Sequence, residues 1–289
     1  MEALNELLAS LDELQSDPAG TQAILDALGV DEPEHSAVEQ AVAKERAIGL
    51  AVMRLANSSL YAGQNDAQDL GDAILRIGHS ELRKLVVAHQ ARQVFSKGGK
   101  AYGLGGEESW SGALAGAIGS EETARRVGGC DPSRAFTAGL YRDCGKLAIE
   151  SLPHGDEFTA KLAAAEDGES LLEMEREIVG YDHPTVGAAL ASLWGLPQVL
   201  VDAIRQHHEP PSDEPNRLSD CVHCGDTIAA HLGYGAGNDG MRYKIDSDAL
   251  ERIGVDLATF LDLLCETKTR MAPFYDQTSD QESSQQEAA

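Results

Sequence analysis

Apolar residues recur along most of this 289-residue chain at the three- and four-residue spacing of an amphipathic helix. No run of alternating apolar and polar residues indicates a strand, and alanine, the best helix former, is abundant throughout. The sequence therefore predicts an all-α fold. The clearest stripes are Leu4, Leu7, Leu11 and Leu14; Leu70, Ile74 and Ile77; Phe136, Leu140, Cys144 and Leu147; and Val186, Leu190 and Leu193.

Charge restricts the classes of partner. The chain has 48 acidic and 23 basic residues, a formal net charge of −25, which disfavours binding to nucleic acids and to anionic membranes. No apolar run approaches the roughly 18 residues of a membrane span, and the N-terminus lacks the pattern of a signal peptide. We therefore expect a cytoplasmic protein whose five cysteines are reduced thiols.

Residues 97–107 are rich in glycine, but neither a preceding strand nor the residue order of a phosphate-binding loop is present. This composition favours a flexible linker between two helical parts. We expect an N-terminal helical subdomain over residues 1–100 and a second helical subdomain over residues 101–275. The polar residues 276–289 have nothing to bury and are predicted to form a disordered tail.

Several ionisable residues fall on or beside apolar stripes of the second half. A buried imidazole or carboxylate is costly unless it is hydrogen-bonded, paired or bound to a metal. Residues from separate helices that converge would make a mixed His/Asp site suited to Fe, Mn or Zn. The candidates are Asp143, His183, His207, His208 and Asp226.

For any one of these residues, a helix cap or a satisfied core group is the simpler interpretation. The same holds for Cys221 and Cys224, which are spaced like half of a zinc site. No second pair of ligands follows at a suitable distance, so two small buried thiols on a helix are expected.

Six segments in order resemble the HDOD domains, relatives of the HD-superfamily metal-dependent phosphohydrolases. The resemblance covers roughly residues 5–270 and implies an N-terminal helical bundle packed on an HD-like helical domain. The segments are Leu50–Ala62, Ala73–Gly78, Phe136–Lys146, Glu177–Gly187, Trp194–Pro197 and Ala203–His208.

Carried over residue by residue, the resemblance implies a degenerate metal site. The His-Asp pair that binds metal in active relatives reads Arg142-Asp143 here, and a second expected histidine, shortly after Trp110, is replaced around Gly112. Asp143 is retained, and His183, His207, His208 and Asp226 match later ligand positions, but the Gly-Tyr-Pro segment of the phosphodiesterase branch is missing after His208. An arginine cannot ligate a cation. Arg142 is expected to pair with Asp143 or with Asp226.

Two functions are consistent with this resemblance. The first is a non-catalytic bacterial signalling module without a cofactor, or with a single residual divalent metal. Its partner would be a protein such as a sensor kinase or a cyclic-dinucleotide protein, or a small signal, and homo-oligomerisation is left open. The alternative is a divergent metal-dependent phosphohydrolase that acts on nucleotides or cyclic dinucleotides.

Overall fold

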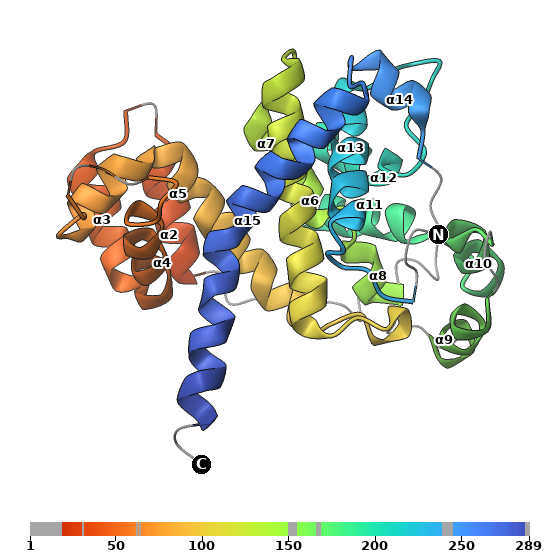
Figure 1. Ribbon diagram of the computed structural model, residues 1–289, viewed down its shortest axis with the longest axis horizontal. Helices are drawn as coiled ribbons and strands as arrows, with labels where there is room; N and C mark the ends of the chain where they lie inside the picture. The colour runs from red at the N-terminus through yellow and green to blue at the C-terminus, as the bar shows by residue number, and fades with distance from the viewer. Residues whose placement is uncertain are drawn as a thin grey trace. The chain divides into compact units, whose positions relative to one another are not determined.

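The computed structural model describes residues 19–30, 32–61, 63, 65–149, 155–165, 169–238 and 245–286 (Figure 1). Within these ranges the chain is helical and has no strand, and a single antiparallel bridge joins Gly99 and Leu104. The all-α prediction is thus confirmed. No helix in the described part combines the length and the apolar character needed to cross a membrane. The predicted leucine stripe at Leu4–Leu14 lies outside the described residues.

The described residues divide into two compact units. The N-terminal unit contains residues 19–90 and 268–286, and the C-terminal unit contains residues 91–267. These limits differ from the predicted boundary after residue 100. The first limit falls within α5 (Leu70–Phe95) and the second within α15 (Leu257–Gln286), because both helices contribute residues to each unit.

The N-terminal unit is built from α2 (Ala19–Leu28), α3 (His35–Lys44), α4 (Arg46–Ala56) and the first part of α5. Their apolar faces share one core, to which Ile24, Val42 and Val52 contribute. Gly78 has φ 81°, a conformation that favours glycine, and it kinks α5 where the sequence predicts a break.

α15 continues through Gln286, where the sequence analysis places a disordered tail. Disorder of the polar residues 276–289 stays a prediction, because helical stability in proteins comes mainly from packing of an apolar face. Residues 287–289 lie outside the described part.

The glycine-rich segment is not a linker between the units. It includes the short 3-10 helix η2 (Lys100–Tyr102) and lies within the C-terminal unit. Ala101, Tyr102 and Leu104 are buried there. The prediction from composition is wrong because these apolar side chains anchor the turn, while Gly98 and Gly103 adopt the positive φ angles that it requires.

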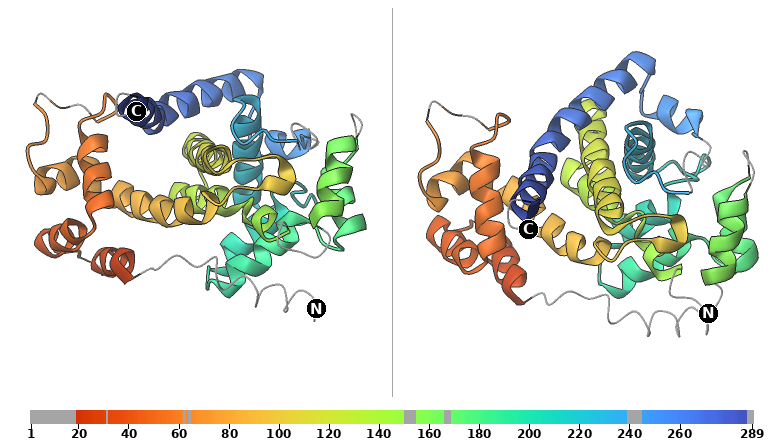
Figure 2. Two further views of the ribbon diagram at one scale, coloured as in Figure 1. Left: turned by 90° about the horizontal axis from the view of Figure 1, so that it is seen from below. Right: turned by 60° about the horizontal axis from the view of Figure 1, so that its bottom comes forward.

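Three helices form the centre of the C-terminal unit: α6 (Gly106–Val127), α7 (Pro132–Tyr141) and α13 (Arg217–His231). Both α7 and α13 pack along α6 (Figures 1 and 2). Glycines permit this close approach, since a Cβ at Gly139 of α7 would lie 2.5 Å from Ser120 Oγ and one at Gly225 of α13 would lie 2.3 Å from Ser120 N.

The remaining helices complete the unit. α11 packs against α8 and α12, and α10 packs against α9. Their bounds are α8 (Cys144–Ile149), α9 (Gly155–Ala164), α10 (Leu171–Ile178), α11 (His183–Leu193), α12 (Gln198–Gln206) and α14 (Ser247–Arg252).

Candidate metal centre

The candidate residues stand at helix ends, where the local sequence fixes their positions. Asp143 lies in the turn between α7 and α8. His183 begins α11, whose N-cap Asp182 accepts a hydrogen bond from Thr185 N. His207 and His208 directly follow α12. Three turns therefore bring side chains from separate parts of the sequence to one place.

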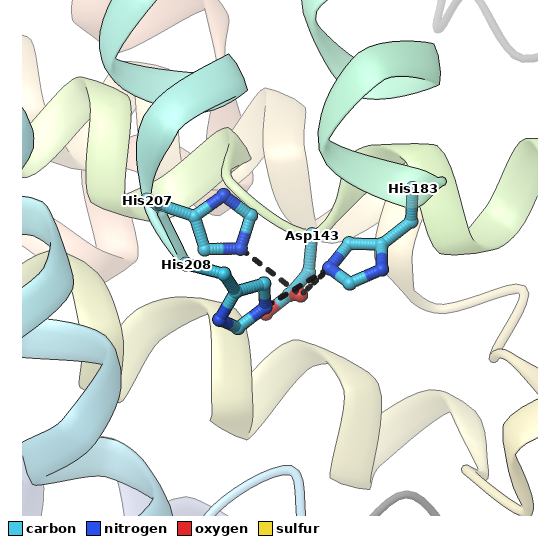
Figure 3. Close-up of side chains that lie close together, drawn as sticks. All are labelled: Asp143, His183, His207 and His208. Atoms are coloured by element: carbon cyan, nitrogen blue, oxygen red, sulfur yellow. Dashed lines mark hydrogen bonds and ion pairs between the residues drawn. The ribbon is translucent and has the colours of Figure 1, made fainter. Parts of the chain in front are cut away.

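Four of the five predicted metal ligands converge there (Figure 3). Asp143, His183, His207 and His208 each offer one ligand atom, and these atoms all lie within 4.8 Å of one another. Asp143 Oδ1 is 3.5 Å from His183 Nε2 and 4.0 Å from His207 Nε2, and the Nε2 atoms of His183 and His208 are 3.1 Å apart. The fifth, Asp226, is outside this group.

Hydrogen bonds orient two of the imidazoles for metal binding. His183 Nδ1 lies 2.9 Å from both carboxylate oxygens of Glu175, and His207 Nδ1 lies 2.7 Å from the carbonyl oxygen of Ile204. Because carboxylate and carbonyl oxygens only accept, each Nδ1 donates, and the Nε2 of the neutral His207 ring keeps its lone pair. His207 Nε2 is buried and has no hydrogen-bond partner among the described residues.

His208 cannot satisfy both of its neighbours as a neutral imidazole. Its Nε2 lies 3.1 Å from His183 Nε2, and its Nδ1 lies 3.5 Å from Asp226 Oδ2. One proton can serve only one of these two contacts. A cation among the four ligand atoms removes the conflict, because His208 can then direct its proton to Asp226.

Burial also selects the protonation states that bind metal. It lowers the pKa of His207 to about 4, although Asp143 and Asp226 oppose this shift. It lowers the pKa of His208 well below its ordinary value, with His207 and His183 adding to the effect. Both imidazoles are therefore neutral near pH 7, as metal ligands must be.

Two cationic side chains, Arg142 and Lys146, contact the carboxylate of Asp143. Arg142 is buried, and its Nη2 lies 3.1 Å from Asp143 Oδ2 while its Nε donates to Asp226 Oδ1 at 2.7 Å. Lys146 Nζ lies 3.0 Å from Asp143 Oδ1. The two pairings of Arg142 that the sequence leaves open therefore occur together. Burial alone would raise the pKa of Asp143, but Lys146 and Arg142 hold it below its usual range.

The charges limit how many ions fit. Asp143, Asp226 and Glu175 carry three negative charges, and Arg142 and Lys146 carry two positive charges. One divalent cation changes the net charge from −1 to +1, whereas two would leave +3 in a buried site. By this charge balance the residues could hold one ion, and Arg142 is bound to both Asp143 and Asp226.

Two glycines of α6, Gly112 and Gly116, lie against Arg142. Gly112 contributes only its carbonyl oxygen, which accepts from Arg142 Nη2 at 3.2 Å, and a Cβ there would meet Gly235 Cα at 2.7 Å. A Cβ at Gly116 would lie 2.0 Å from Arg142 Nη1. A missing side chain at residue 116 therefore makes room for the guanidinium.

Sequence reasoning missed Glu175 and its partner Tyr102. Glu175 is fully buried, accepts from His183 N at 2.8 Å and accepts from the Tyr102 hydroxyl at 2.7 Å. Its position was detectable, because Glu175 falls on the apolar stripe of α10 with Leu171 and Leu172. Tyr102 gave no such signal in its glycine-rich setting.

Cys221 and Cys224 are buried in the apolar clusters around α13, and the metal group found among the described residues does not include them. His223 between them has another role. Its Nδ1 lies 2.8 Å from the carbonyl oxygen of His207 and its Nε2 accepts from Asp246 N at 2.9 Å. It thereby supports the backbone of a candidate ligand.

Comparison with solved structures finds the same fold. An HDOD domain protein of unknown function from Geobacter sulfurreducens matches with a TM-score of 0.68 at 23% identity, over 91% of this chain and 87% of the other. A proposed phosphohydrolase from Shewanella amazonensis matches with a TM-score of 0.60 at 25% identity, over 90% and 97%. A proposed signal transduction protein from Marinobacter aquaeolei matches with a TM-score of 0.63 at 18% identity, over 92% and 59%.

No curated protein matches the chain significantly. The family model of the HDOD domain matches residues 14–210, which is more than half of the chain and includes every candidate ligand except Asp226. The chain therefore belongs to the HDOD family.

Proposed function

We propose that this protein is a non-catalytic regulatory module of bacterial signal transduction, which binds a protein partner or a small signal through its HDOD scaffold. The observation that carries the proposal is the buried Arg142, which binds Asp143 and Asp226 at once. Two-metal hydrolysis requires two ions about 4 Å apart that hold and activate water. A fixed guanidinium on both carboxylates replaces one of these ions with a charge that cannot ionise a water molecule.

Asp143, His183, His207 and His208 would hold a single ion, and Fe, Mn or Zn suits this set of nitrogen and oxygen donors. Such an ion would act as a Lewis acid toward an oxygen ligand. The protein's own contribution is to orient the imidazoles through Glu175 and Ile204 and to keep them buried. We propose that this ion links the ends of α7, α11 and α12 without supporting turnover.

The second candidate is a divergent metal-dependent phosphohydrolase. The convergence of four ligand atoms favours it, as does the likeness to the Shewanella amazonensis protein. It would require hydrolysis with one ion beside Arg142 and Lys146, both of which could bind a phosphate oxygen.

Elemental analysis and turnover assays on the same purified full-length protein test the proposal. We expect at most about one Fe, Mn or Zn per chain, lost in His207→Ala. We also expect no hydrolysis of bis(p-nitrophenyl) phosphate or of cyclic dinucleotides with any of these metals. A control variant, His231→Ala, removes an imidazole that is not in the ligand group and should keep its metal.

Metal-dependent hydrolysis by the native protein that disappears in His207→Ala would overturn the proposal in favour of the second candidate. The partner is tested separately by affinity capture with the native full-length protein. We expect a sensor kinase or a cyclic-dinucleotide protein to be retained, because these are the partners that membership of the HDOD family implies.

A further inference from the structure

A tight turn in the glycine-rich segment carries Tyr102. Gly99 and Leu104 exchange two backbone hydrogen bonds of 3.0 Å, which close the turn around η2. Gly103, directly after Tyr102, has φ 71°, a conformation that favours glycine. The backbone at Tyr102 is therefore fixed by a short stretch of chain.

Tertiary contacts fix the rest of this tyrosine. Asn238 N donates to the carbonyl oxygen of Tyr102 at 2.7 Å, and a Cβ at Gly237 would lie 2.2 Å from the same oxygen. The ring centroids of Tyr102 and Phe158 are 5.1 Å apart, and Lys146 Nζ lies 5.6 Å from the centroid of the Tyr102 ring, within the range of a cation–π interaction. Tyr102 is fully buried, so its hydroxyl has a fixed position.

The hydroxyl of Tyr102 is directed at the carboxylate of Glu175. It donates to Glu175 Oε1 at 2.7 Å, and Glu175 is itself fully buried. Glu175 Oε2 accepts from His183 N at 2.8 Å, and both carboxylate oxygens lie 2.9 Å from His183 Nδ1. The carboxylate is thus held by two segments, the start of α11 and the turn of Tyr102.

Only one of these two segments is independent of the imidazole that Glu175 orients. In the described part of the chain, the groups other than Tyr102 that hydrogen-bond to this carboxylate both belong to His183. Without the hydroxyl, the carboxylate and the imidazole could turn together. Such a turn would move His183 Nε2 from its place 3.5 Å from Asp143 Oδ1 and 3.1 Å from His208 Nε2.

We propose that Tyr102 is a positioning residue of the candidate metal centre, which acts through Glu175 to hold the imidazole of His183 in the orientation of a ligand. Partners that orient a ligating histidine contribute to metal affinity although they do not touch the ion. This inference rests on the single ion of the proposed function. It adds a residue from the glycine-rich segment, outside the ligand group, that determines how tightly the ion is held.

The test compares the Zn²⁺ affinities of full-length proteins by competition with a chromophoric chelator. Tyr102→Phe removes the hydroxyl and keeps the ring that contacts Phe158 and Lys146. We expect roughly tenfold weaker binding, at the lower end of the range of about 10- to 100-fold for partners that orient metal ligands. The matched control Tyr61→Phe removes the hydroxyl of a partly buried tyrosine in the N-terminal unit and should bind Zn²⁺ as the native protein does.

A double variant separates positioning from a general loss of structure. In a Glu175→Leu background, Tyr102→Phe should change the affinity by less than about twofold, because the carboxylate that the hydroxyl holds is absent. A purely structural role would instead give the same roughly tenfold loss in both backgrounds. Circular dichroism and the melting temperature in the presence of a chelator show that each variant is folded.

An unchanged affinity in Tyr102→Phe would overturn the inference, and so would equal losses in the two backgrounds. A native protein that binds no Zn²⁺ would overturn it together with the proposed ion. These outcomes are distinguished from a failure of the proposed regulatory function, which is metal-dependent hydrolysis, because the quantity measured is affinity and not turnover.

Discussion

Replacing Arg142 with methionine tests the electrostatic basis of the site most directly. Methionine keeps an unbranched chain of similar length and removes the charge. Asp143 retains Lys146 at 3.0 Å, but Asp226 loses its 2.7 Å partner and keeps only His208 Nδ1 at 3.5 Å. Removing one partner of a buried ion pair costs about 3–5 kcal/mol. For a domain of this size each kcal/mol corresponds to about 2–4 °C, so the melting temperature should fall by about 6–20 °C.

Arg126→Met is the matched control for this measurement. Arg126 also contacts two carboxylates, Asp262 and Glu266, but these groups are exposed. Exposed ion pairs contribute little to stability, so the melting temperature should barely change. Both variants are compared with the native protein by calorimetry in the presence of a chelator, because a bound ion would mask the loss.

A double variant isolates the Arg142–Asp226 contact. Asp226→Asn removes the charge that Arg142→Met leaves unpaired, so the two changes together should cost less than their sum by up to about 3 kcal/mol. Strict additivity of the two changes would refute the reasoning. An Arg142→Met protein as stable as the Arg126→Met control would refute it as well.

Three further outcomes are expected. Glu175→Gln should weaken metal binding about 10- to 100-fold in a competition titration with a chelator, because it loosens the tautomer of His183, whereas Glu177→Gln at an exposed carboxylate should not. The pH midpoint for iodoacetamide modification of Cys130 should rise in Cys221→Ala, because Cys221 lowers the pKa of Cys130 as a hydrogen-bond donor and alanine has no donor. Asn57→Ala removes two hydrogen bonds to the backbone of Ala67 and should cost the N-terminal unit about 1–3 kcal/mol in urea unfolding.

The sequence predicts the helices well because their signals are local. The periodicity predicts His183 on an apolar stripe with Val186 and Leu190, and all three are buried on α11. The predicted break at Gly78 is also a property of a single residue. The prediction of a flexible linker at residues 97–107 fails because of a tertiary contact. Tyr102 is buried against Glu175, which belongs to a segment far along the chain.

The candidate site, too, is predicted only in part by the sequence. Periodicity and motif order bring Asp143 together with the three histidines, but they cannot tell which carboxylate Arg142 reaches. They also cannot separate Gly112 from Gly116, since both are glycines on one face of α6. The choice depends on how α6, α7 and α13 approach one another, which is set by packing at Ser120.

The contacts of Arg142 indicate that its guanidinium stabilises the fold of the C-terminal unit. Its Nη1 donates to the carbonyl oxygen of Gly139 at 2.8 Å and its Nη2 to that of Gly112, in addition to the two carboxylates. The absent side chain at Gly116 provides its space. A bare divalent ion could replace the charge of the guanidinium but not its planar set of donors, which reaches α6, α7 and α13 simultaneously. The group that we propose takes the place of a second ion therefore also joins the three central helices, and substituting Arg142 alone would leave the carbonyls of Gly112 and Gly139 without this buried donor.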